Sequence, residues 1–313
     1  METTSKKNNG KKILLIVLAI LVIIRVMTIP GCVSKMIYGN GDQVDEEPFD
    51  SFAILRLYGT IDDNVDHDNL MDYVDYLIDD ETNHGIFLVV NSGGGAVYET
   101  DEFYLKLLEY KEKTGRPVHA YFEDTAASGA YYISCAADYI SRNRNCMTGS
   151  IGVIISYMNY AGLFERFGVK EEIIASGPNK AMGHNGIEMT EEQRQIFQDF
   201  VDESYEQFIS IVAEGRKMDI ETVRPIADGR IYSALQAKEL GLVDRVETYD
   251  EAMLKMEKKT GYEGFEPTFY EPITLMDLIY GKLEELKPKS DLEILEEMAS
   301  SEQDLRPMYM FIP

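Results

Sequence analysis

Short apolar runs alternate with amphipathic stretches through the middle of the chain. The runs Ala53–Leu57, Ile86–Val90 and Val118–Phe122 have the length and composition of buried strands. Between the last two runs, Phe103, Leu107 and Leu108 mark a helical face. Because strands alternate with helices, the pattern predicts an α/β fold in which parallel β-sheets are wrapped by helices.

The longest predicted helix begins after Thr190. The sequence T-E-E-Q from Thr190 to Gln193 fits a capping box, in which the side chains of the first and last residues cap the helix start. Apolar residues then recur every three or four positions, at Ile196, Phe197, Phe200, Val201, Tyr205, Phe208 and Val212. This stripe predicts a face that packs in the core or against another subunit.

The N-terminus predicts a membrane anchor. Four lysines lie within residues 1–12, and residues 13–29 are apolar except for Arg25. Seventeen residues are just long enough to cross the hydrocarbon layer if Arg25 reaches toward the far interface. The lysines predict a cytoplasmic N-terminus and a domain outside the cell membrane. The alternative is a cleaved or lipid-modified signal ending near Cys32, which Pro30 and Arg25 disfavour.

The remaining chain divides by composition. Residues 30–50 are acidic toward their end and predict a solvated tether, and residues 51–250 hold the predicted α/β domain. Residues 251–313 turn to charged helical segments and finish in an apolar tail at 308–313. We expect this tail either to pack on the domain or to be bound as a peptide.

Charge and cysteine content narrow the class of function. The 313 residues carry a formal net charge of −25, which argues against nucleic-acid partners and against attraction to anionic lipids. We therefore expect membrane contact only through the N-terminal segment. Cys32, Cys135 and Cys146 lack metal-ligand spacing, and no metal or cofactor is expected. A disulfide between Cys135 and Cys146 is an open alternative to buried thiols.

The candidate nucleophile is Ser128. It follows the predicted strand 118–122 in the sequence T-A-A-S-G-A-Y-Y and precedes a run compatible with a helix. A strand, a tight turn of small residues and a helix would present the hydroxyl beside free backbone N–H groups, which can stabilise an oxyanion. A lone serine in this setting is usually a helix cap, so the interpretation depends on the accompanying motifs.

A serine hydroxyl needs a base to take its proton. His67 and His84 fall in polar, acidic stretches and His119 in a predicted strand, so only His184 is kept as an alternative base. Lys180 closes the segment A-S-G-P-N-K, which follows a predicted strand around residues 172–174. A lysine accepts a proton only where burial lowers its pKa, so this hypothesis requires a buried lysine beside the serine.

Two further segments accompany this pair. Ser150, in M-T-G-S-I-G-V-I, offers a hydroxyl that would orient the amine of Lys180. The loop N-S-G-G-G-A-V at 91–97 follows the predicted strand 86–90, and its glycines let backbone N–H groups point at a ligand. Alone, such a loop is as often a flexible turn.

Together the four segments resemble those of the bacterial signal peptide peptidase A family, membrane-anchored Ser-Lys proteases with a crotonase-like fold related to Clp protease. The resemblance covers residues 52–244, including A-D-G-R-I-Y-S-A at 227–234. It implies that Ser128 is the nucleophile, Lys180 the general base and Ser150 the residue that holds the lysine. It also implies an oxyanion hole formed by the N–H groups of Gly95 and Ser128.

The resemblance implies an endopeptidase that degrades hydrophobic peptides, such as signal peptides left after protein export. A single domain copy resembles the short form of the family, in which a homo-oligomeric ring completes the active site. Two alternatives are a crotonase-like enzyme acting on acyl-CoA and an inactive scaffold. An acidic domain suits anionic CoA poorly, and the complete motifs around Ser128 and Lys180 argue against an inactive scaffold.

Overall fold

The computed structural model describes residues 50–62, 65–267 and 307–310, all of which belong to one compact unit. The predicted anchor at 13–29 and nearly all of the tether lie outside these residues. Within the described ranges, none of the helices combines the length and the apolar character needed to cross a bilayer.

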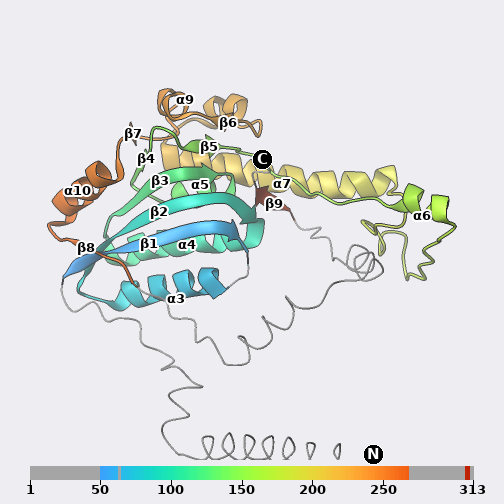
Figure 1. Ribbon diagram of the computed structural model, residues 1–313, viewed down its shortest axis with the longest axis horizontal. Coiled ribbons are helices and arrows are strands. Elements are labelled where there is room, and N and C mark those ends of the chain that lie inside the picture. The colour runs from blue at the N-terminus through green and yellow to red at the C-terminus, as the bar shows by residue number, and fades with distance from the viewer. Residues whose placement is uncertain (1–49, 63–64, 268–306, 311–313) are drawn as a thin grey trace, which may run out of the picture. The chain divides into compact units, whose positions relative to one another are not determined.

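A mostly parallel sheet forms the centre of the unit (Figure 1). Its main path runs in the order β6-β5-β3-β2-β1-β8, with β4 and β7 branching from β3 and with β9 on β2. The strands are β1 (Ser51–Ile61), β2 (Asn83–Ala96), β3 (Val118–Ala127), β4 (Tyr139–Arg142), β5 (Met147–Gly149), β6 (Ile231–Tyr232), β7 (Arg245–Val246), β8 (Gly264–Phe265) and β9 (Met308–Met310). Among these pairs only β5 with β6 and β2 with β9 are antiparallel.

Helices cover both faces of this sheet. They are α3 (Val65–Asp79), α4 (Val97–Thr114), α5 (Gly129–Ser134), α6 (Ala161–Phe167), α7 (Glu191–Arg216), α8 (Ile220–Val223), the 3₁₀ helix η1 (Arg224–Ile226), α9 (Ala234–Glu239) and α10 (Tyr249–Thr260). The predicted capping box is confirmed, because Gln193 N–H donates to the Thr190 hydroxyl and the Gln193 side chain accepts from Thr190 N–H.

Successive side chains of each strand point to opposite faces of the sheet, so the sheet separates two hydrophobic cores. On β2, Leu88 faces the larger core beneath α3, α4 and α5, whereas Phe87 and Val89 face the opposite side. There Ala252 and Met256 of α10 complete a smaller core. The predicted mixed α/β fold with a largely parallel sheet is therefore confirmed. Because α10 and β8 pack on this sheet, the described compact unit continues past residue 250 to Pro267.

Two local predictions differ from the structure. The glycine segment was expected to be a loop, but Gly93, Gly94 and Gly95 continue β2, and Gly94 and Gly95 pair with β1. The stretch 172–174 was expected to be a strand, but it pairs with none of the described strands and leaves Ile174 fully exposed. A strand is stable where a neighbouring strand pairs with its backbone N–H and C=O groups. The stretch 172–174 has no such neighbour among the described strands.

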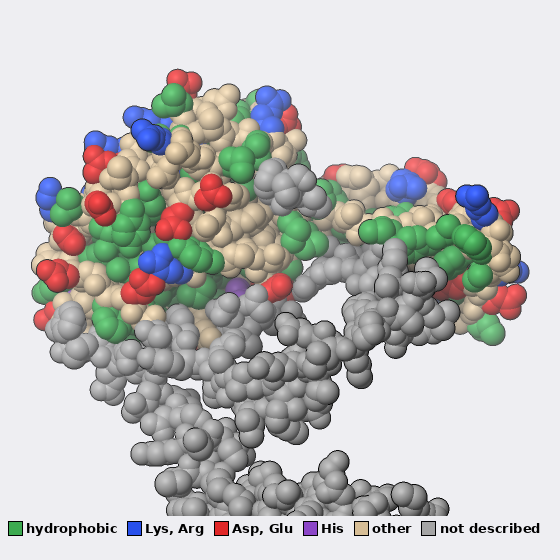
Figure 2. All heavy atoms as spheres, in the orientation of Figure 1, with side chains coloured by type: hydrophobic (Ala, Val, Ile, Leu, Met, Phe, Trp, Pro, Cys, Tyr) green, Lys and Arg blue, Asp and Glu red, His purple; other side chains and the backbone are tan. Residues whose placement is uncertain are grey.

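The stretch 172–174 belongs to a projecting segment, residues 155–190, which we call the arm. It carries α6 and lies beside the N-terminal half of α7, away from the sheet (Figure 1). Hydrophobic side chains gather on its visible face (Figure 2). The exposed large apolar residues of the arm are Met158, Leu163, Phe167, Val169, Ile173 and Ile174. Such a concentration is typical of a surface that contacts another protein.

Candidate active site

Ser128 occupies a strained position between β3 and α5. Its backbone angles, φ 54° and ψ −121°, lie in a region that residues other than glycine rarely adopt. Strain of this kind costs about 1–3 kcal/mol and is typical of functional positions. The side chain is buried, and its Oγ has no hydrogen-bond partner among the described residues. The predicted strand, turn and helix are therefore confirmed. They hold the Ser128 hydroxyl in a position where it makes no hydrogen bond with the described residues.

The backbone N–H of Ser128 already has an acceptor. It donates to the carbonyl oxygen of Gly149 at 2.8 Å, continuing the pairing of β3 with β5. This bond corrects the expectation that Ser128 N–H forms the oxyanion hole. The nearest alternative donor is the next residue, Gly129, whose nitrogen lies 2.6 Å from where a Cβ on Gly94 would be.

Glycine is required at the end of β2 because two other backbones approach it closely. A Cβ on Gly95 would lie 1.8 Å from the carbonyl oxygen of Ile61 on β1. Gly94 has φ 97°, and its Cβ would lie 2.0 Å from the carbonyl oxygen of Tyr309. The glycines thus leave room for a narrow channel along the end of β2, on the edge opposite β1.

Strand β9 fills this channel as an extended peptide. On one side, Val97 N–H donates to Pro307 O at 3.3 Å, and Gly95 is paired with Tyr309. Because antiparallel pairs alternate, Gly95 and Tyr309 form the next hydrogen-bonding pair. On the other side, Met308 exchanges hydrogen bonds of 2.9 and 3.1 Å with Ile154. The tail is therefore held along both edges, as a peptide is in strand addition.

The carbonyl group of Tyr309 lies beside the candidate nucleophile. Its oxygen is 3.0 Å from where a Cβ on Gly129 would be, and the nitrogen of Gly95 is 3.2 Å from that point. Gly129 directly follows Ser128. The carbonyl oxygen of Tyr309 therefore lies close to the backbone of Gly129, the residue after Ser128, and close to Gly95 N.

Replacing Gly94 by alanine should block this channel. The new methyl group would collide with the backbone of any peptide bound as β9 is, so we expect peptide cleavage to fall by more than about 100-fold, from loss of positioning. Gly59→Ala is the matched control, because Gly59 also has a positive φ of 73° but has nothing within 4 Å of the added Cβ. Hydrolysis of a short apolar peptide measures both variants, and equal activity would contradict the placement of the substrate.

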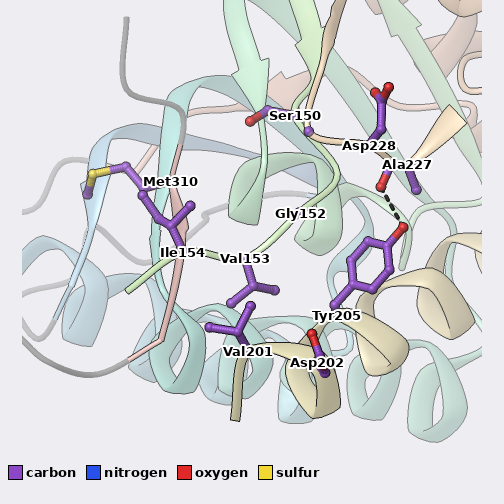
Figure 3. A pocket seen from close by; sticks show the side chains of 11 residues that line it. Ser150, Gly152, Val153, Ile154, Val201, Asp202, Tyr205, Ala227, Asp228 and Met310 are labelled. Carbon is purple, nitrogen blue, oxygen red and sulfur yellow. Dashed lines mark hydrogen bonds between the residues drawn. The ribbon is translucent and has the colours of Figure 1, made fainter. Parts of the chain in front are cut away.

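Ser150 lies at the edge of an open cavity next to the tail (Figure 3). Its φ is 49°, its N–H donates to Arg230 O at 2.7 Å, and it is 8% exposed. The cavity has a volume of about 560 Å³ and also contacts Met310. Asp202 and Asp228 line it, so a cation entering this space would meet two carboxylates. The pairing of β3 with β5 places Ser150 next to Gly149, whose carbonyl oxygen accepts the Ser128 N–H.

Lys180 is not beside Ser128 within the described chain. It is exposed and lies in a turn on the arm, where Pro178 O accepts a 2.9 Å hydrogen bond from Gln193 Nε2 on the first turn of α7. Ser204, which contacts the tail, lies further along α7. The rise of an α-helix per residue places it about 16 Å from Gln193 along the helix axis. Within the described residues, Lys180 is therefore not the buried lysine beside Ser128 that base catalysis needs.

The histidines also lie elsewhere. His119 is buried with its ring bonded to Ser141, and burial lowers its pKa to about 3. His184 is on the arm and pairs with Glu171 at 2.9 Å, and His84 pairs with Asp50 at 2.9 Å. His67 packs against Phe103. None of these contacts brings an imidazole to the Ser128 hydroxyl.

Among the described residues, the cysteines are free thiols and the acidic side chains form no metal-binding group. Cys135 and Cys146 are both free thiols, so the alternative of a disulfide between them is wrong, and burial raises the pKa of each to about 12. The described part of the chain has no group of three or more side chains suited to a metal ion.

The sequence did not identify four residues that contact the tail at the site. Ile154 supplies the second edge of the channel, Tyr132 and Phe208 contact the Tyr309 ring, and Ser204 O accepts a hydrogen bond from the Tyr309 hydroxyl. Tyr132 lies four residues, about one helical turn, after Ser128. That spacing could have indicated that Tyr132 lies on the same side of α5 as the candidate nucleophile. Phe208 appeared only as part of an apolar stripe.

Comparison with known proteins places the chain in a family. The family model for peptidase family S49 matches residues 110–263. The chain is 37% identical over 245 residues to a protein of Enterococcus faecium named as a candidate signal peptide peptidase SppA, covering 72% of this chain and 71% of that protein. The chain belongs to peptidase family S49, the family of serine peptidases that its motifs resemble.

More distant relatives match over a smaller share of their own length. Protease 4 of Haemophilus influenzae is 28% identical over 212 residues, which cover 66% of this chain and 34% of that protein. A chloroplastic serine protease, SPPA, of Arabidopsis thaliana is 30% identical over 158 residues, which cover 50% of this chain and 23% of the relative.

Proposed function

We propose that this protein is a membrane-anchored serine endopeptidase with a crotonase-like fold that cleaves hydrophobic peptides, such as remnant signal peptides, by a Ser-Lys mechanism. The observation that carries the proposal is the tail, bound as an extended strand with the Tyr309 carbonyl among the glycines beside Ser128. A substrate peptide would take the same path between β2 and Ile154.

The backbone contacts explain how the site would accept many peptides. The hydrogen bonds to Gly95, Val97 and Ile154 involve main-chain atoms only, so they fix the register of a peptide without reading its sequence. Selectivity then has to come from side-chain sites along the strand. The apolar tail residues Met308 and Met310 show the kind of side chain that fits beside the channel.

In the proposed reaction, Ser128 Oγ attacks the carbonyl carbon of the residue bound as Tyr309 is. The N–H groups of Gly95 and Gly129 stabilise the oxyanion. The peptide bond to the next residue breaks, its nitrogen takes a proton and leaves, and an ester to Ser128 remains. Water hydrolyses this ester and regenerates the hydroxyl.

We assign the proton transfer to Lys180 of a second copy of the chain. Ser128 Oγ lacks a partner within the described residues, Lys180 is exposed on the arm, and the arm presents apolar side chains suited to a subunit contact. The cavity lined by Ser150, Asp202 and Asp228 would receive the lysine, with the Ser150 hydroxyl orienting its amine. Assembly into a homo-oligomeric ring would complete every site in this way.

The two alternatives fit less well. An acyl-CoA enzyme has to bind an anionic ligand, but the cavity beside Ser128 is lined by Asp202 and Asp228. A scaffold without activity has no use for the strained backbone at Ser128, which costs stability.

The tail itself provides a test of the proposal. If the site cleaves the bond after Tyr309, the incubated wild-type chain should lose residues 310–313, while Ser128→Ala stays full length. Intact-mass measurement of both proteins detects the difference.

The control for a contaminating protease is a mixture of the two proteins, in which Ser128→Ala is cleaved only at the rate that added wild type explains. Equal tails after long incubation would contradict cleavage at this bond and favour the alternative in which the tail is a permanent strap.

A further inference from the structure

Thr100 places a buried hydroxyl next to the candidate active site. It lies one turn into α4, the helix that begins directly after the glycines of β2, and it is 0% exposed. Its Oγ1 has no hydrogen-bond partner among the described residues. Burying a hydroxyl without a partner costs free energy of folding, so a position that keeps one needs an explanation.

Several other hydroxyl side chains in the described helices find an acceptor within their own helix. Thr114 ends the same helix as Thr100, and its hydroxyl donates to the carbonyl oxygen of Tyr110 at 2.6 Å. The same bond to the carbonyl four residues earlier is made by Ser134, Ser210 and Thr260. The corresponding acceptor for Thr100 would be Ala96, and this described pair makes no such bond. The Thr100 hydroxyl is therefore free to bond to a group outside its helix.

The hydroxyl faces the space that the carbonyl oxygen of the tail approaches. A Cβ on Gly129 would lie only 2.6 Å from Thr100 Oγ1. The same point is 3.0 Å from the carbonyl oxygen of Tyr309 and 3.2 Å from the nitrogen of Gly95. Because Gly129 has no side chain, this point is open and the three groups converge on it. The carbonyl oxygen of a peptide bound as β9 is therefore shares a small space with the hydroxyl.

The Thr100 hydroxyl and the Tyr309 carbonyl oxygen make no hydrogen bond with each other. When a nucleophile adds to a carbonyl carbon, the oxygen moves and gains negative charge, so the donors that matter are those near its final position. A bond made only in the transition state accelerates a reaction, whereas a bond made equally to the bound substrate does not. A nearby hydroxyl that is not yet engaged meets this condition.

We propose that Thr100 is a further catalytic residue, whose hydroxyl donates a hydrogen bond to the oxyanion alongside the N–H groups of Gly95 and Gly129. This inference rests on the proposed function and adds a side-chain donor to its oxyanion hole. Ser128 and Thr100 are both 0% exposed, so the charge develops away from water. A hydrogen bond to an anion is strong in such surroundings.

The step that Thr100 would assist is the addition of the serine to the peptide. Ser128 Oγ bonds to the carbonyl carbon, the electron pair of the carbonyl π bond moves to the oxygen, and the serine proton passes to the base. Thr100 keeps its own proton throughout and donates only a hydrogen bond. When the peptide bond breaks, the electron pair returns and the oxygen again becomes part of a carbonyl group.

Thr100→Val tests this role, because valine keeps the shape of threonine and replaces the hydroxyl by a methyl group. For the full chain and the peptide Pro-Met-Tyr-Met-Phe, we expect kcat to fall about 100- to 1,000-fold, the effect of losing one oxyanion donor. KM should change less than about 3-fold, because the lost bond forms only in the transition state. Thr100→Ser retains a hydroxyl and should recover at least about a tenth of the wild-type kcat.

Thr114→Val is the matched control within α4. The Thr114 hydroxyl donates to Tyr110 O and accepts from Arg116 N–H, so its loss should lower the melting temperature and leave kcat unchanged. Thr100→Val breaks no hydrogen bond with the described residues and should not lower the melting temperature. A lower melting temperature with an unchanged kcat in Thr100→Val would assign its hydroxyl a structural role and overturn the inference.

A peptide aldehyde probes the oxyanion itself. The aldehyde of acetyl-Pro-Met-Tyr bonds through its carbonyl carbon to Ser128 Oγ, the serine proton passes to the base, and the aldehyde oxygen takes the place of the oxyanion. The corresponding alcohol binds without this bond. Thr100→Val should weaken inhibition by the aldehyde at least about 10-fold, the effect of one hydrogen bond to a charged oxygen, and leave inhibition by the alcohol unchanged.

The outcomes separate this inference from the proposed function. Cleavage that depends on Ser128 but keeps its wild-type kcat in Thr100→Val would overturn the inference and leave the function standing. A reduced kcat with unchanged inhibition by the aldehyde would also overturn it, because the hydroxyl would then act elsewhere than at the oxyanion. Inhibitor affinity that depends on Thr100, in a chain whose peptide cleavage does not need Ser128, would support the contact and overturn the function.

Discussion

Ser128→Ala should abolish peptide cleavage, with a loss of at least about 10⁴-fold, because no other group can take the place of the attacking hydroxyl. The fold should be unaffected, since the Oγ makes no hydrogen bond with the described residues. Hydrolysis of an apolar peptide and thermal unfolding, measured on the same preparation, check both parts of this prediction.

Ser128→Gly is the companion variant. Glycine adopts φ 54° and ψ −121° without the penalty that serine incurs there, so this inactive variant should be more stable than Ser128→Ala by about 1–2 kcal/mol. A gain in stability with loss of activity would show that the strain serves the position of the hydroxyl. Residual activity in either variant above about 1% of wild type would remove Ser128 from the nucleophile role.

Mixing two inactive variants should restore activity if the lysine comes from a second copy. Lys180→Ala and Ser128→Ala should each be inactive in homo-oligomers. In a random one-to-one assembly, roughly a quarter of the sites combine an intact serine with an intact neighbouring lysine, so about 25% of wild-type activity should return. Co-expression with two different affinity tags isolates the mixed assemblies for the assay.

The control pairs Ser128→Ala with a chain that carries both substitutions. These assemblies retain Lys180 in some copies but contain no intact serine, and they should remain inactive. Absence of recovery in the first mixture, with mixed assemblies demonstrated by their tags, would contradict transfer of the proton between copies. Full activity of Lys180→Ala alone would remove the lysine from the mechanism and direct attention to His184.

The strands and the turn at Ser128 could be predicted because their signals are local. Apolar runs of five residues marked β1, β2 and β3, and small residues marked the turn before α5. The capping box at Thr190 is likewise contained within four residues. In each case the decisive interactions join residues that are close in sequence.

The substrate channel could not be predicted because its parts are far apart in the chain. Gly95 pairs with Tyr309, and Met308 bridges to Ile154, across more than 150 residues. The glycines were expected to form a loop because consecutive glycines permit positive φ, but close approach of Ile61 and Tyr309 is what requires Gly95 and Gly94.

The position of the proposed base, Lys180, relative to Ser128 could not be predicted from the order of the motifs. Lys180 follows Ser128 in the sequence as the family resemblance implies, but order along a chain does not determine which copy supplies a side chain. The arm carries Lys180 away from Ser128 in the same subunit and leaves Ile173 and Ile174 exposed. If the arm packed against a second copy of the chain, Lys180 would approach Ser128 of that copy. The same contact would bury Ile173 and Ile174.

Labelling with a fluorophosphonate probe tests the central claim most directly, because the probe forms a covalent bond only with an activated serine. Digestion and mass spectrometry of the labelled full chain should place the adduct on Ser128 and not on Ser150, and labelling should be lost in Lys180→Ala assemblies. An adduct on another serine, or no adduct on Ser128 in a preparation that cleaves peptides, would contradict the account.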